Sequence, residues 1–115
     1  MSTKRILKIN ELLKRELSQL LLKEVEFPED VFVTITRVET SVDLREAIVS
    51  ISTMPSSEAG RVRQILNCCV YDLQQEINKK LRMRPIPKII FREEKKVSQA
   101  ARIEELLEKI KKEKG

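Results

Sequence analysis

Hydrophobic residues recur with a helical period in the first part of the chain, between about residues 4 and 24. Charged and polar residues fill most of the positions between them. This pattern predicts an amphipathic helix that buries one face. Pro28 ends it, because proline disfavours a helical conformation in the residue before it. The apolar face consists of Ile6, Ile9, Leu13, Leu17, Leu20 and Leu21.

Two segments rich in β-branched residues follow, at residues 31–40 and 45–54. Within the second, apolar side chains stand at every second position over residues 47–51, a period typical of a strand. The connection between the segments contains Ser41 and Asp43, whose side chains can form hydrogen bonds with the nearby backbone. We therefore expect the two strands to form an antiparallel hairpin.

A second helical spacing runs from Val62 to about Arg82, and the pattern alone leaves open whether it forms one helix or two. Ser56 and Ser57, with Glu58 after them, predict a helix start at which a serine side chain caps the first turn.

Pro85 and Pro87 stop this helix. Residues 88–92 then predict a short third strand with Ile89 and Phe91 on one side. Proline just before a strand favours an edge position or a strand that begins at that point.

The predicted order is helix, strand, strand, helix or helix pair, strand, helix. Strands grouped in this way indicate an α+β fold, with a three-stranded sheet and helices packed on one face. A length of 115 residues suits one domain. We take residues 1–115 as that domain, with residues 98–115 as a C-terminal helix and tail. The apolar stripe of this last helix consists of Ile103, Leu106, Leu107 and Ile110.

The composition excludes several classes of site. Histidine is absent, and the chain has only two glycines, so neither a histidine-based nucleophilic site nor a glycine-rich phosphate loop can be formed. Cys68 and Cys69 are adjacent, so we interpret them as buried small apolar side chains, and they are too few for a zinc site. We expect no catalysis, cofactor or metal. Lacking a membrane-spanning run or a secretory signal, the protein is expected in the cytoplasm.

Positive charge is concentrated in one stretch, residues 79–92, which contains six basic residues and no acidic one. The other 17 basic residues are offset by 18 carboxylates. Such a local excess favours a nucleic-acid contact, although a basic run can also be only a solvated surface. We expect the four aromatic residues to lie mostly in the core, so binding would depend on phosphate contacts and shape.

Two motifs resemble the ribosome-binding factor A family. They are T-I-T-x-V-E-x-S-x-D-L-x-x-A at residues 34–47 and L-R-x-R-x-x-P at residues 81–87. The similarity extends from about Lys8 to Ile110. It implies a KH-like domain of the bacterial type, ordered helix-strand-strand-helix-helix-strand with a C-terminal helix. It also implies a non-catalytic factor that binds free 30S subunits and assists late maturation and 16S rRNA processing, notably in the cold.

The family interrupts its second helix at an A-x-G motif in place of a G-x-x-G clamp, and the matching positions here are Cys69, Val70 and Tyr71. Tyr71 departs from the glycine, and residues 27–29 depart from the usual D-P-R. We expect a monomer that contacts 16S rRNA and no membrane. The predicted contacts are Lys79, Lys80, Arg82, Arg84, Lys88 and Arg92, with Lys8 on the first helix.

Two other functions stay open at this point. One is a protein-interaction module whose sheet edge or C-terminal helix docks a ribosomal protein or another assembly factor. The other is an RNA-processing enzyme, although the sequence contains no residue set typical of one.

Overall fold

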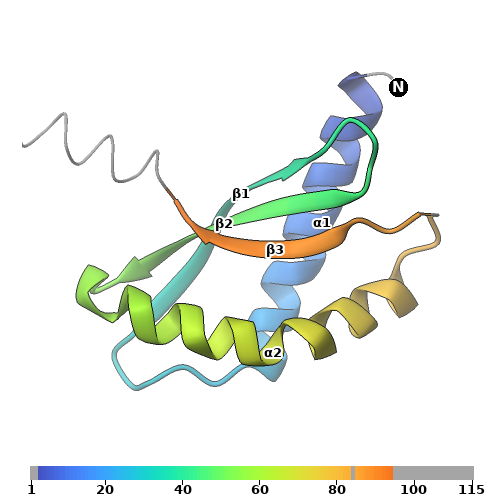
Figure 1. Cartoon of the computed structure of the whole chain (residues 1–115). Helices are drawn as coiled ribbons and strands as arrows, with labels where there is room; N and C mark the ends of the chain where they lie inside the picture. Colours follow the sequence, from blue (N-terminus) through green and yellow to red (C-terminus); the bar gives the residue numbers. More distant parts are fainter. Residues whose placement is uncertain (1–2, 84, 95–115) are drawn as a thin grey trace, which may run out of the picture.

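The computed structural model describes residues 3–83 and 85–94 (Figure 1). The chain order confirms the predicted α+β fold up to the third strand. The predicted C-terminal helix at residues 98–115 lies outside the described residues. The elements are α1 (Thr3–Glu24), β1 (Phe32–Thr40), β2 (Glu46–Met54), the short 3-10 turn η1 (Ser56–Glu58), α2 (Ala59–Lys80) and β3 (Lys88–Glu93).

The sheet has the order β1-β2-β3, so β2 is the central strand. β1 and β2 pair antiparallel, with Thr40 opposite Ala47 and an irregularity between Ile35 and Arg37. β3 pairs parallel to β2 after the crossover through α2. It begins at Lys88 and occupies an edge, as the prolines before it predicted.

Side chains of the hairpin turn hold its backbone in place. The Ser41 hydroxyl accepts a hydrogen bond from the Glu46 N–H (3.1 Å) and donates one to Asp43 Oδ1 (2.6 Å). The Arg45 N–H donates to the same Asp43 oxygen (3.1 Å). Leu44 has a left-handed backbone (φ 61), which is costly for a branched residue, but its side chain is buried in the core. The predicted hairpin and its turn chemistry are confirmed.

Both helices pack on the same core as the sheet. α1 contacts β1, α2 contacts β3, and the two helices contact each other. Buried side chains of α1 match the predicted face, except that Ile6 is only partly buried. The sheet contributes alternate residues of β2 and β3, and from β1 two residues on either side of its irregularity. They are Ala47, Val49, Ile51, Ile89 and Phe91, with Ile35 and Val38 from β1.

α2 is one helix, which answers the question that the spacing left open. It runs without a break across Cys69, Val70 and Tyr71, so the interruption implied by the family resemblance is not found there. The physical reason is that none of these residues is glycine, and each keeps a helical conformation.

The predicted serine cap of α2 is wrong. Ser56 and Ser57 form the 3-10 turn η1, in which the Glu58 N–H donates to the Pro55 carbonyl (3.0 Å). Glu58 occupies the cap position of α2 and makes no side-chain capping bond. Because the backbone of the turn already supplies the bonds, the serine hydroxyls are not needed there.

Candidate nucleic-acid interface

Buried anchors fix both ends of the segment that joins α2 to β3. The Leu81 N–H donates to the Ile77 carbonyl (3.0 Å), and the backbone at Leu81 then becomes extended. Leu81 and Pro87 are buried, as is Ile89 just inside the strand. The charged residues around these anchors project into solvent. They are Lys79, Lys80, Arg82 and Lys88.

The hairpin turn lies against the start of β3 (Figure 1), where a backbone hydrogen bond joins Lys88 to Arg45. The Lys88 N–H donates to the Arg45 carbonyl (2.9 Å), and the Arg45 side chain is 84% exposed. Its Nε lies 3.7 Å from Asp43 Oδ2. Sequence reasoning missed Arg45, because only the parallel pairing of β2 with β3 makes it a neighbour of Lys88.

Two of the lysines lie beside carboxylates. Lys80 Nζ is 3.9 Å from Glu16 Oε2 on α1, and Lys79 Nζ is 4.0 Å from Glu76 Oε1. Pairs of this kind at a surface contribute little to stability, so their ammonium groups remain available to phosphate. Lys8 is exposed on α1 about two turns before Glu16. We call the surface formed by Lys79, Lys80, Arg82, Lys88 and Arg45 the C-terminal basic cluster, after its place at the end of α2.

Arg92 does not join the C-terminal basic cluster. β3 runs back along α2, so Arg92 lies near the start of that helix, where it and Arg63 line the same small pocket. The stretch from Lys79 to Arg92 therefore supplies cations to both ends of α2 instead of one patch. Arg84 lies outside the described residues.

The expectation that the aromatic residues lie mostly in the core is wrong for two of the four. Tyr71 on α2 is 71% exposed and Phe32 at the start of β1 is 69% exposed. Phe91 is buried and Phe27 partly buried. Tyr71 projects outward because the buried positions of α2, among them Leu66 and Leu73, lie on the opposite face of the helix.

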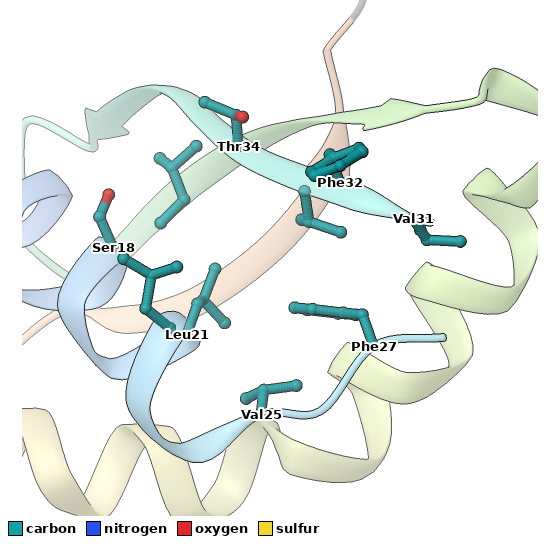
Figure 2. A pocket seen from close by; sticks show the side chains of 10 residues that line it. Ser18, Leu21, Val25, Phe27, Val31, Phe32 and Thr34 are labelled. Carbon is teal, nitrogen blue, oxygen red and sulfur yellow. The ribbon is translucent and has the colours of Figure 1, made fainter. Parts of the chain in front are cut away.

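A hydrophobic groove of about 390 Å³ is lined by the second half of α1, the connection that follows it and the start of β1. Figure 2 shows Phe27 reaching toward Leu21 across it, with Val25 below and Phe32 and Thr34 above. The polar side chains in its lining are hydroxyls, from Ser18 and Thr34. None of the described residues that line the groove has an acidic or basic side chain.

The cysteines differ from the prediction in one respect. Cys69 is partly buried, but Cys68 is exposed, so only one of them behaves as a core side chain. In residues 3–83 and 85–94, no group of three or more potential ligands could hold a metal ion. The described helices include none that is both long and apolar enough to cross a membrane.

Asp43 in the hairpin turn is an exposed carboxylate with a shifted titration. The hydrogen bond from the Ser41 hydroxyl lowers its pKa below the ordinary value, and the Arg45 N–H acts in the same direction. The folded turn therefore favours the ionised form of Asp43.

Comparison with known proteins identifies the family. Residues 5–107 match the sequence profile of ribosome-binding factor A. The chain belongs to the ribosome-binding factor A family. One relative, ribosome-binding factor A of Thermodesulfovibrio yellowstonii, is 37% identical over 109 residues, which cover 95% of this chain and 92% of the relative.

Solved ribosome-binding factor A structures share the fold. The crystal structure of the Thermus thermophilus protein aligns with a TM-score of 0.66 and 19% identity, covering 76% of this chain and 94% of that one. A Thermus thermophilus coordinate set fitted into a cryo-EM map of a 30S complex aligns with a TM-score of 0.59 and 21% identity, covering 72% and 88%. The family fold is KH-like, which confirms the predicted fold class.

Proposed function

We propose that this protein binds the free small ribosomal subunit by placing its C-terminal basic cluster on 16S rRNA, and that it assists assembly without catalysis. One observation carries the proposal. The α2–β3 connection and the hairpin turn meet at the Lys88–Arg45 hydrogen bond and present Lys79, Arg82, Lys88 and Arg45 to solvent.

Phosphate groups are the ligands that suit this surface. Its cations lie at the end of α2, at the start of β3 and in the two connections beside them. Proteins neutralise nucleic-acid phosphates with such groups, and the affinity falls as the salt concentration rises. Arg82 and Arg45 can each donate two hydrogen bonds to one phosphate, whereas a lysine acts as a point charge. Contacts of this type position a protein on a folded RNA and do not read its sequence.

The finer roles in the proposal rest on family membership. They are late maturation of the 30S subunit, processing of 16S rRNA and adaptation to cold, carried out by a cytoplasmic monomer without a cofactor. The Thermus thermophilus relative fitted into a 30S complex supports the choice of partner. Arg92, Lys8 and Arg84 belong to the proposed contact set as secondary members.

Sedimentation tests the proposal. Tagged protein expressed in a bacterium should travel through a sucrose gradient with free small subunits and not with complete ribosomes. Precursor 16S rRNA incubated with the pure protein and a divalent metal should remain uncleaved. Protein that stays at the top of the gradient, or RNA that is cut, would contradict the proposal.

The hydrophobic groove favours a second candidate, a protein-docking module. It lies beside edge strand β1, and the exposed side chains of Phe32 and Leu22 border it. A ribosomal protein or another assembly factor held there would bury apolar surface, and its affinity would change little with salt. Phosphate-dominated binding weakens log-linearly with salt, so a salt titration separates the two candidates.

A further inference from the structure

The solvent-facing ridge of α2 has an unusual composition. Its exposed residues combine amides, a thiol, one aromatic ring and terminal cations. Exposed Asp72 follows Tyr71 directly in the chain, and Glu76 lies beside Lys79. The ridge consists of Arg61, Gln64, Cys68, Tyr71, Gln75 and Lys79.

Tyr71 stands near the middle of this ridge. It follows Arg61 by ten residues and precedes Lys79 by eight, which correspond to about 15 Å and about 12 Å along a helix. With 71% of its surface exposed, the ring adds little to the core. Tyrosine is also a weaker helix former than alanine, so the fold does not account for its presence.

Basic residues lie on both sides of the Tyr71 ring along the helix. Arg61, Arg63 and Arg92 lie near the start of α2, where Arg63 and Arg92 share a pocket. The C-terminal basic cluster lies at its other end. Arg61 Nε is 3.6 Å from Glu58 Oε2, a surface pair that contributes little and leaves the guanidinium accessible. A strand with regularly spaced negative charge therefore meets cations at both ends of the helix and an aromatic face between them.

We propose that a single-stranded segment of RNA lies along this ridge, with one base stacked on Tyr71 and its phosphates at the two basic ends. The proposal rests on the proposed function, because that function supplies RNA as the partner. Stacking suits any base, since every base has an aromatic face. Exposed Gln64 and Gln75, one on each side of Tyr71, offer amide donors and acceptors to base edges.

The chain carries its own optical reporter for this contact. It has one tyrosine and no tryptophan, so its intrinsic fluorescence comes from Tyr71 alone. Titration with a single-stranded oligouridylate of about eight nucleotides, within the range of single-stranded sites, should quench this emission. A parallel titration of free tyrosine amide corrects for absorption by the RNA. A base-paired RNA hairpin should quench much less.

Binding of the same oligonucleotide to variants provides the second measurement. Tyr71→Ala should weaken it about 5- to 150-fold, the range found when a stacking ring is removed. Tyr71→Phe keeps the ring and should stay within about threefold of the unmodified protein. Phe32→Ala, at the other exposed aromatic, is the matched control and should bind as the unmodified protein does.

Unchanged emission at saturating oligonucleotide would overturn the ridge proposal, as would Tyr71→Ala binding with unchanged affinity or equal quenching by the hairpin. These results leave the proposed function standing if the unmodified protein still sediments with small subunits. A protein that binds the oligonucleotide through Tyr71 but never sediments with subunits would instead refute the proposed function alone.

Discussion

The side-chain oxygen of Gln74 accepts a hydrogen bond from the Ile89 N–H at 2.7 Å, which joins α2 directly to the start of β3. The amide nitrogen of Gln74 donates to the Pro87 carbonyl and to Asn78 Oδ1, both at 3.1 Å. One partly buried side chain thus satisfies both backbone groups where the chain re-enters the sheet. This contact fixes the start of β3, with Lys88, relative to the second half of α2.

Removing this link should destabilise the fold. Gln74→Ala leaves the Ile89 N–H and the Pro87 carbonyl without their partner, which we expect to lower the free energy of unfolding by about 1 to 3 kcal/mol. Urea unfolding followed by circular dichroism measures the change. Gln75→Ala, at the adjacent exposed position, is the control and should change stability by less than about 0.5 kcal/mol. Equal effects of the two variants would contradict this role of Gln74.

The buried face of α1 allows a matched test of the core. Leu17 is fully buried, whereas Leu22 is 87% exposed on the same helix. Leu17→Ala should cost about 2 to 5 kcal/mol through lost burial and a residual cavity. Leu22→Ala should stay within about 0.5 kcal/mol. A large loss at Leu22, measured by the same urea method, would show that the groove beside it is covered in solution.

Gly60 is a position where a stabilising change is expected. It lies in the first turn of α2, and a Cβ built on it would meet no other atom within 4 Å. Gly60→Ala should therefore raise the free energy of unfolding by about 0.5 to 1 kcal/mol, because alanine restricts the unfolded chain and favours the helix. Thermal unfolding would show a higher midpoint. A lower midpoint would mean that the backbone at Gly60 needs glycine.

The hairpin turn should make stability depend on pH in the acid range. The pKa of Asp43 is lower in the folded chain than in the unfolded one, mainly because of the Ser41 hydroxyl. Its contribution is therefore complete above the unfolded pKa of about 4 and is lost as the pH falls through the folded value. The stability difference between the unmodified protein and Asp43→Asn, measured by urea unfolding, should shrink on acidification below about pH 4. The difference for Val42→Ala, at an exposed turn position without a titrating group, should stay constant.

The helices and strands could be predicted from local sequence patterns because the interactions that form them are local. The apolar period of the first helix follows from the single face that it buries, and the hairpin follows from the bonds that Ser41 and Asp43 make within the turn. The serine cap of α2 failed for an equally local reason, since the backbone turn at residues 56–58 satisfies the helix start.

The candidate site depends on contacts between strands and helices that the local sequence pattern does not contain. Arg45 is a neighbour of Lys88 only because β3 pairs with β2 in parallel. Arg92 lies away from the cluster because β3 runs back along α2. The exposure of Tyr71 was accessible to sequence reasoning, because its helical phase is opposite to that of Leu66 and Leu73. The number of aromatic residues alone does not indicate which face of α2 carries Tyr71.

The affinity of the protein for purified free small subunits, measured across a range of salt concentrations, tests the central claim most directly. The pair Arg82→Glu and Lys88→Glu reverses two cations of the C-terminal basic cluster. The pair Lys14→Glu and Lys23→Glu makes the same change of charge at exposed positions of α1. For about four phosphate contacts, the plot of log affinity against log salt should have a slope of about −3.

In the cluster variant we expect weaker binding at every salt concentration and a slope reduced in size by about 1.5, because two phosphate contacts are lost. The control variant should keep the slope and most of the affinity of the unmodified protein. Equal losses in the two variants, or an affinity that does not change with salt, would contradict the claim that this cluster holds ribosomal RNA.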